Sequence, residues 1–178
     1  MAEVLALTGF MGSGKSAAGR RAAERLGWDF VDLDELVEDR ERMPIPEIFA
    51  SRGDSGFRES EVEALRAVFA EIPERPARNL VLALGGGTIT NGVARDLLRE
   101  QAFVAYLATP VQVCWNRTRA SDHRPLAGER ASFEELADDR ESLYESSADM
   151  VMDTEDLPLE EIARRLEELG RALEGSPS

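Results

Sequence analysis

The sequence is poor in the side chains on which many metal sites and covalent mechanisms depend. It has one cysteine, Cys114, and one histidine, His123. An intrachain disulfide is therefore excluded, and neither a Cys/His zinc cluster nor a Ser-His-Asp triad is plausible. Lysine is equally rare, because Lys15 is the only lysine among 21 basic residues. Any catalytic chemistry must come from carboxylates, arginines, Lys15 and a bound ion.

Long apolar runs and an excess of positive charge are also missing. No stretch reaches the length of a membrane span, and the N-terminus lacks the basic-then-apolar layout of a signal peptide, so we expect a cytoplasmic protein that binds no membrane. The net charge of −14 argues against nucleic acid as a partner, because binding a phosphate backbone needs a basic face. With 178 residues, we expect a monomer with one domain at residues 1–173 and a disordered tail at 174–178.

The single lysine lies in a complete phosphate-binding loop. Residues 9–16, GFMGSGKS, match the pattern GxxxxGK[ST], with a buried strand expected before them and a helix after them. The glycines let backbone N–H groups turn inward around an anion, and the following helix adds its positive N-terminal end. Lys15 can then reach the β- and γ-phosphates, and the Ser16 hydroxyl can bind Mg²⁺. The sequence thus predicts a nucleoside triphosphate site.

The apolar pattern alternates between strands and helices along the chain. Short apolar runs predict strands at residues 4–8, 28–33, 80–84, 103–108 and 150–152. Helical periodicity predicts helices at 15–26, 33–42, 46–51, 53–72, 92–100, 111–119, 133–146 and 158–173. The capping-box pattern of Ser132 and Glu135 marks the expected start of the helix at 133. This alternation is typical of an α/β fold whose parallel sheet is covered by helices on both faces.

Polar residues follow two of these strands at the edge where ligands of such sheets bind. Asp32 and Asp34 end the second strand, and strand alternation predicts that both point to the same side, where they could serve Mg²⁺ and a substrate hydroxyl. Asp34 could instead cap the next helix. Three glycines at 85–87 end the third strand, and they form either a structural turn or a contact to substrate.

Several arginines stand at positions suited to anion binding. Helical spacing places Arg58 on the stripe of Val62 and Leu65, where Glu61 can hold its guanidinium. Arg140 has apolar residues at the i−4, i+3 and i+4 positions. Each arginine alone could snorkel or form an ion pair, but two on inward stripes could also clamp a carboxylate.

A charged loop follows the helix at 111–119. In residues 117–126, RTRASDHRPL, a mobile arginine could close over the phosphates and neutralise charge on the transferred group. We interpret His123 as a solvent-facing residue of this loop.

Together, these motifs resemble the shikimate kinase family. The matching residues are the phosphate loop, Asp32 and Asp34, residues 45–49 and 56–61, residues 83–87, Arg117 with 124–126, and Arg140 with Tyr144. The resemblance covers about residues 3–166. It implies a P-loop kinase fold, a three-layer α/β/α arrangement with a five-stranded parallel sheet in the order 2-3-1-4-5. It also implies ATP-dependent phosphorylation of the 3-hydroxyl of shikimate, with Mg²⁺ as cofactor, in aromatic amino-acid biosynthesis.

The resemblance further implies roles for individual residues. Asp34, Arg58, Arg140 and the backbone at Gly86 and Gly87 would bind shikimate, with Asp34 orienting its hydroxyls or accepting the proton. The nucleotide would be bound by Gly12, Ser13, Gly14, Lys15, Ser16, Ala17, Arg117 and Arg124, of which Lys15 and Arg124 would act in catalysis. Ser16 and Asp32 would hold Mg²⁺. An acceptor-binding segment is expected at about 33–62 and a lid at about 117–131.

Two alternative functions remain open at this stage. Another P-loop kinase, acting on gluconate or a nucleoside monophosphate, would keep Lys15 and the lid arginines but would not need Asp34, Arg58 and Arg140 together. A GTPase-like switch would need a second lysine in its guanine-reading motif, which this sequence lacks. A non-catalytic nucleotide-binding module would not be expected to keep all of these groups.

Overall fold

The computed structural model describes residues 3–72, 79–119 and 130–175, and its centre is a sheet of five parallel strands. The strands are β1 (Val4–Thr8), β2 (Asp29–Asp32), β3 (Leu80–Ala83), β4 (Phe103–Ala108) and β5 (Met150–Asp153). Their order is β2-β3-β1-β4-β5, as predicted. The central strand β1 pairs with β3 on one side and with β4 on the other.

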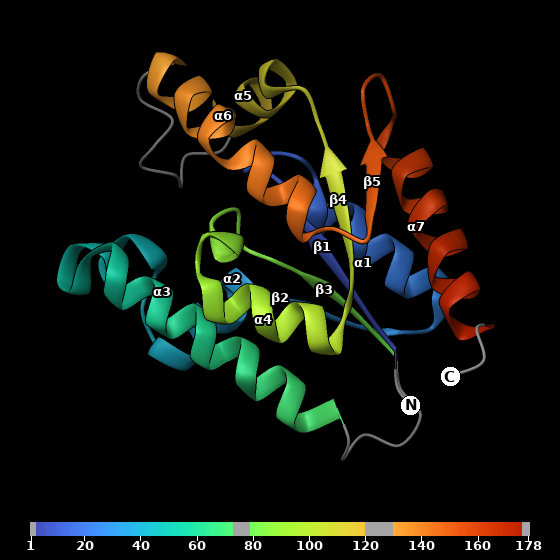
Figure 1. The fold of residues 1–178 in the computed structure, drawn as a ribbon, viewed down its shortest axis with the longest axis horizontal. Helices are drawn as coiled ribbons and strands as arrows, with labels where there is room; N and C mark the ends of the chain where they lie inside the picture. The colour runs from blue at the N-terminus through green and yellow to red at the C-terminus, as the bar shows by residue number, and fades with distance from the viewer. Residues whose placement is uncertain (1–2, 73–78, 120–129, 176–178) are drawn as a thin grey trace.

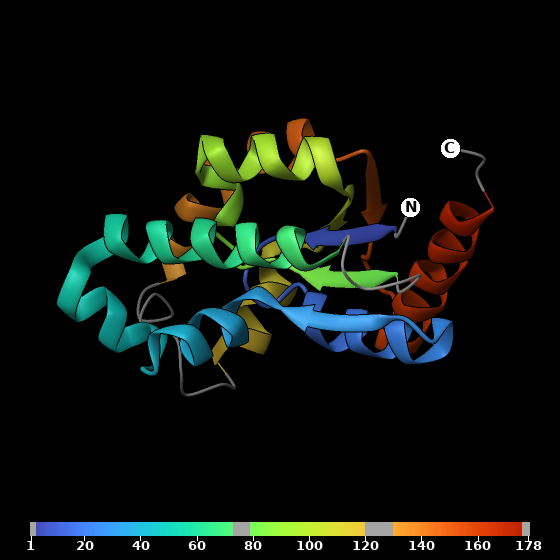
Figure 2. The same ribbon diagram turned by 90° about the horizontal axis from the view of Figure 1, so that it is seen from below.

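Helices cover both faces of this sheet. They are α1 (Lys15–Leu26), α2 (Leu33–Glu41), α3 (Ile45–Glu71), the 3-10 helix η2 (Thr88–Thr90), α4 (Gly92–Gln101), α5 (Val111–Arg119), α6 (Arg130–Ser147) and α7 (Leu159–Glu174). Helices α1 and α7 lie on one face, and α3, α4 and α6 lie on the other (Figures 1 and 2). The predicted three-layer α/β/α architecture is confirmed.

The alternation of strand side chains creates one apolar core on each face. In β1, Leu5 and Leu7 are fully buried with Ala18 and Ala22 of α1 and residues of α7. Val4 and Ala6 point the other way, into the larger core that includes α3, α4 and α6. Because both faces of β1 and β3 are buried, these two strands read in sequence as continuous apolar runs.

Several predicted boundaries change in the structure. The helices expected at 46–51 and 53–72 form one element, α3, with a kink at Gly53 (φ 69°, ψ −172°). Figure 2 shows α3 running beyond the sheet before it bends. The start predicted for the helix at 133 is wrong, because α6 begins at Arg130 and its first turn includes Ser132.

The C-terminal end is also more ordered than expected. Glu174 is the last residue of α7, and its carboxylate accepts hydrogen bonds from Trp28 Nε1 (2.8 Å) and Asn79 Nδ2 (3.0 Å). The disordered tail predicted from residue 174 therefore does not begin there, and residues 176–178 lie outside the described part of the chain. No helix among the described residues is both long and apolar enough to cross a membrane.

Candidate active site

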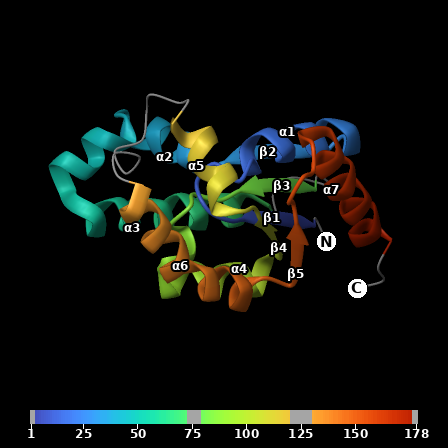
Figure 3. The same cartoon turned by 90° about the horizontal axis from the view of Figure 1, so that it is seen from above.

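The phosphate loop, residues 9–14, connects the central strand β1 to α1. Figure 3 shows α2, α3 and α5 gathered on the side of the molecule toward which β3 points. Gly12 has a left-handed backbone (φ 81°), and a Cβ built there would lie 2.6 Å from the carbonyl oxygen of Cys114 in α5. Conformation and space thus both require glycine at this position. Burial raises the pKa of the Cys114 thiol to about 11, which makes it a neutral packing group.

Lys15 lies inside the loop. Its side chain is 7% exposed, and Nζ donates hydrogen bonds to the carbonyl oxygens of Gly9 (2.8 Å) and Phe10 (3.0 Å). Helix α1 begins at Lys15 without a side-chain cap, because its N-cap residue is Gly14. The first N–H groups of a helix have no partner within the helix, so those at Lys15, Ser16 and Ala17 can bind an anion.

Helix α5 borders the loop on the β4 side. Arg117 Nη1 lies 3.3 Å from the carbonyl oxygen of Gly12 and 3.5 Å from that of Ser13. The Thr109 hydroxyl also donates to the Ser13 carbonyl oxygen (3.3 Å) and lies 2.6 Å from the Thr154 hydroxyl oxygen. The sequence predicted the position of Arg117 near the nucleotide, but it gave no signal for the two threonines because they lie 45 residues apart.

Asp32 and Asp34 do not share one face of a strand, so the orientation predicted from strand alternation is wrong. Strand β2 ends at Asp32, and Asp34 lies in the first turn of α2. Asp32 caps this helix, with Oδ1 accepting from the N–H groups of Asp34 (3.0 Å) and Glu35 (3.3 Å). The cap is therefore Asp32 rather than Asp34. Asp34 instead points to the glycine turn after β3, since a Cβ built on Gly85 would lie 2.5 Å from Asp34 Oδ1.

Arg58 of α3 reaches the same glycine turn. Its side chain is 14% exposed, and Nη1 forms an ion pair with Glu61, as the spacing predicted. A Cβ built on Gly87 would lie 2.3 Å from Arg58 Nη2, so the guanidinium rests directly on this glycine. The buried Nε atom has no hydrogen-bond partner among the described residues. A buried, unpaired donor on an arginine is suited to an incoming anion.

Arg140 of α6 also reaches the glycine turn. Its Nη1 donates to the carbonyl oxygen of Gly86 (3.3 Å), and the hydroxyl of Tyr144 donates to the same oxygen. Tyr144 is 1% exposed and stacks on Tyr106 of β4 with ring centroids 5.1 Å apart. Burial raises the pKa of Tyr144, so its hydroxyl stays protonated and remains a donor.

Glu61 is the most deeply buried carboxylate of the site, with 1% of its surface exposed. Its Oε1 accepts from the Thr88 hydroxyl (2.6 Å), and Oε2 accepts from Arg58. Burial raises the pKa of Glu61, the Arg58 charge and the Thr88 hydrogen bond oppose this, and Asp34 adds to it. The Thr88 contact was not predicted, because it joins helices 27 residues apart.

The structure thus brings Asp34, Arg58, Arg140 and the glycine turn together, close to the phosphate loop: a Cβ on Gly86 would lie 3.3 Å from the Met11 nitrogen. Ser16 and Ala17 are exposed at the start of α1. Arg124 and His123, with most of the expected lid, lie outside the described residues.

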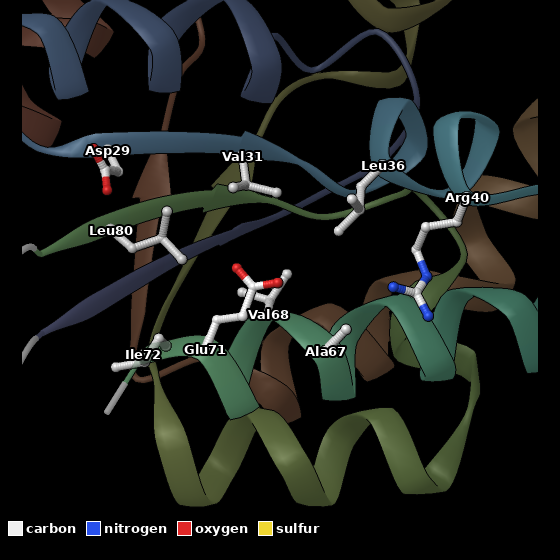
Figure 4. Close-up of a pocket in the computed structure, with 9 residues that line it drawn as sticks. All are labelled: Asp29, Val31, Leu36, Arg40, Ala67, Val68, Glu71, Ile72 and Leu80. Atoms are coloured by element: carbon white, nitrogen blue, oxygen red, sulfur yellow. The ribbon is translucent and has the colours of Figure 1, made fainter. Parts of the chain in front are cut away.

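A cavity of about 90 Å³ lies elsewhere, between the edge of the sheet and helices α2 and α3 (Figure 4). Asp29 and Leu80, the first residues of β2 and β3, line it. It therefore lies toward the amino ends of these strands, opposite the phosphate loop, and holds none of the predicted site residues.

Comparison with known proteins matches the chain to shikimate kinases. The shikimate kinase family model matches residues 11–169. A shikimate kinase of Halorhodospira halophila is 41% identical over 175 residues, covering 97% of this chain and 94% of that protein. One of Moorella thermoacetica is 39% identical over 170 residues and covers 94% of each. The structure of a shikimate kinase from Acinetobacter baumannii in complex with shikimate has a TM-score of 0.88 and 31% identity, covering 99% of this chain and 97% of that one.

Proposed function

The chain belongs to the shikimate kinase family, and on that premise we propose that it transfers the γ-phosphoryl group of ATP to the 3-hydroxyl of shikimate, giving shikimate 3-phosphate and ADP. It is a small-molecule kinase of the shikimate pathway. The observation that supports this acceptor best is the meeting of a carboxylate and two arginines at one glycine turn beside the phosphate loop. Shikimate carries a carboxylate and hydroxyls, which these groups can bind.

We assign the acceptor carboxylate to Arg58 and Arg140. Both guanidinium groups lie against residues 86 and 87, and Arg58 has a buried donor available at Nε. Planar guanidinium groups bind carboxylates with well-defined geometry. Asp34, across Gly85 from Glu61, would orient the reacting hydroxyl and accept its proton as the oxygen attacks phosphorus. A loose phosphoryl transition state needs little help from a base, so orientation is its main contribution.

On the nucleotide side, residues 12–17 would bind the phosphates through backbone N–H groups and the N-terminal end of α1. Lys15 would contact the β- and γ-phosphates, and Arg117, already beside Gly12 and Ser13, would approach from the adenine side. The role proposed for Arg124, neutralising charge on the transferred group, rests on the sequence motif alone. In-line transfer then depends on positioning and fixed charge.

The residues present fit a magnesium ion. Ser16 and Asp32 supply a hydroxyl and a carboxylate, the oxygen donors that Mg²⁺ prefers, and the Asp32 Oδ1 atom is fixed by its two helix-capping bonds. Bound with ATP, the ion would neutralise phosphate charge and orient the γ-phosphoryl group. We assign Ser16 as a direct ligand and Asp32 as a ligand directly or through water. We also propose that the protein is cytoplasmic and monomeric. Light scattering of the purified protein would test the monomeric state.

The function is tested by measuring ATP-dependent ADP release with shikimate, gluconate and AMP offered in parallel. We expect release with shikimate only, with a product that carries one phosphoryl group on the 3-hydroxyl. Activity with gluconate or AMP but not with shikimate would overturn the proposal. In the same assay Arg124→Ala should lower kcat by about 10³-fold if Arg124 acts on the transferred group. An unchanged kcat would remove Arg124 from the mechanism.

A further inference from the structure

Thr88 lies in the acceptor site, but the proposed reaction gives it no role. It is the first residue of η2 and is fully buried, with its side chain turned toward α3. Its hydroxyl donates a 2.6 Å hydrogen bond to Glu61 Oε1. Threonine is not needed there to build the turn, because the bonds that form it come from the backbone: Thr88 N–H to Gly85 oxygen and Thr90 N–H to Gly87 oxygen.

The carboxylate that receives this bond is difficult to keep ionised. Glu61 is 1% exposed, and Asp34 stands close to it, since both carboxylates would lie within 2.6 Å of a Cβ built on Gly85. Burial and this like charge favour the protonated form. Two described groups oppose them, the guanidinium of Arg58 and the hydroxyl of Thr88.

The ionised form of Glu61 matters because Arg58 depends on it. Arg58 Nη1 pairs with Glu61 Oε2, and Nη2 lies 3.4 Å from a carboxylate oxygen of Asp54, whose side chain is 72% exposed. The guanidinium carbon also lies 5.1 Å from the centroid of the Phe57 ring. An exposed ion pair of this kind holds a side chain weakly. The buried partner therefore fixes the guanidinium against Gly87. Protonated Glu61 would offer the guanidinium only a neutral acceptor, and this bond is weaker than the ion pair with the carboxylate.

We propose that Thr88 is a positioning residue for the acceptor: its hydroxyl bonds to the buried Glu61 carboxylate and orients it, and Glu61 holds Arg58 in place to bind the acceptor carboxylate. The proposal rests on the proposed function, because it concerns binding of the same acceptor. Within residues 3–72, 79–119 and 130–175, charged and titratable groups face Glu61 and η2 from four helices: Asp34 from α2, Asp54 and Arg58 from α3, Arg95 from α4, and Arg140 and Tyr144 from α6.

The test compares Thr88→Val, which removes the hydroxyl but keeps the shape, with Thr88→Ser, which keeps the hydroxyl. We expect Thr88→Val to raise the KM for shikimate about tenfold at the acid end of the pH range in which the enzyme is folded, the effect of losing a hydrogen bond to a charged group, with the KM for ATP unchanged. The rise should shrink as the pH increases, because Glu61 ionises again and recovers Arg58. Thr88→Ser should behave like the wild type.

Thr90→Val is the matched control. Thr90 lies in the same 3-10 helix and is exposed, and its hydroxyl bonds to the Gly87 carbonyl oxygen rather than to Glu61. We expect it to lack the pH-dependent rise in KM. Three outcomes would each overturn the proposal. They are the same rise in Thr90→Val, a rise of equal size at every pH in Thr88→Val, and a KM for shikimate in Thr88→Ser that differs from the wild-type value.

A second measurement does not depend on turnover. In protein labelled with 13C at glutamate carboxyl groups, the Glu61 resonance is identified by its absence from Glu61→Gln. We expect it to titrate at a higher pH in Thr88→Val than in the wild type. An unchanged titration would refute the role of Thr88 even if the wild type phosphorylates shikimate. Absence of shikimate-dependent ADP release together with the shifted titration would instead reject the proposed function and leave the Thr88–Glu61 link intact.

Discussion

The two halves of the site differ in how far apart along the chain their residues lie. The phosphate loop and its lysine come from one continuous stretch, residues 9–17, and Lys15 finds hydrogen-bond partners within that stretch, because these side-chain bonds join positions at most six residues apart. Thr109 and Arg117 add bonds to this loop from distant positions. The acceptor side is assembled from α2, α3, the glycine turn, η2 and α6, and its bonds span up to 58 residues. The first half is therefore a local structure that a motif can specify, whereas the second exists only when the whole domain is folded.

The largest expected effect comes from removing the positive charge of Lys15 from the phosphate loop. Lys15→Met should lower kcat by about 10³-fold or more, because a fixed cation at the transferred phosphoryl group is lost. The KM for shikimate should change little. Lys15 also bonds to the Gly9 and Phe10 carbonyl oxygens, so thermal unfolding should be followed in parallel. A shikimate KM that rises as much as kcat falls would show that the halves are not separable.

Removing a cation from the acceptor side should instead change the KM for shikimate. Arg58→Ala should raise the KM for shikimate by about 10²-fold, the effect expected when a buried charge partner is truncated, while the KM for ATP stays near the wild-type value. Arg66→Ala, an exposed arginine two turns further along α3, is the matched control and should be neutral. Steady-state kinetics with each substrate varied in turn separates the two effects. Equal changes in both KM values would contradict the assignment.

A smaller effect concerns the free energy of unfolding, which the buried Glu61 carboxylate of the acceptor side should make dependent on pH. Burial raises the pKa of Glu61, so the unfolded chain loses this proton at lower pH than the folded protein does. The free energy of unfolding of the wild type should fall as the pH rises from the ordinary value of 4.5 through the raised pKa. Glu61→Gln should lack this fall, and its shikimate KM should be about tenfold higher. Urea unfolding between pH 4.5 and 8.5 measures the difference, and identical pH profiles would disprove it.

The smallest expected change concerns the Gly86 carbonyl oxygen. Tyr144→Phe removes one of two donors to this atom and keeps the ring that stacks on Tyr106. Because Arg140 remains, we expect a rise in the shikimate KM of about threefold, equivalent to a modest neutral hydrogen bond. Tyr106→Phe, which keeps the stack but leaves Gly86 untouched, provides the comparison. A larger effect in Tyr106→Phe would place the disturbance in the stack instead.

The same contrast explains how much the sequence could predict. Strand order and the position of Lys15 followed from motif and family resemblance, and the Arg58–Glu61 pair followed from helical spacing. The orientation of Asp34 did not, because the strand ends at Asp32, two residues before Asp34, so the alternation rule does not apply to it. Thr88 and Thr109 were missed because a hydroxyl gains its role from a partner brought near only by tertiary packing. The helix end at Glu174 likewise depends on distant Trp28 and Asn79.

The place of β1 between β3 and β4 has a consequence for the path of the reaction. β3 delivers the glycine turn with Arg58 and Arg140 around it, and β4 delivers Thr109 and Arg117. The acceptor and the base of the nucleotide would thus approach the phosphate loop from opposite flanks of the central strand. We therefore expect the phosphoryl group to move past the carboxyl end of β1, from the β4 side to the β3 side. The order of the strands would then set the direction of the transfer.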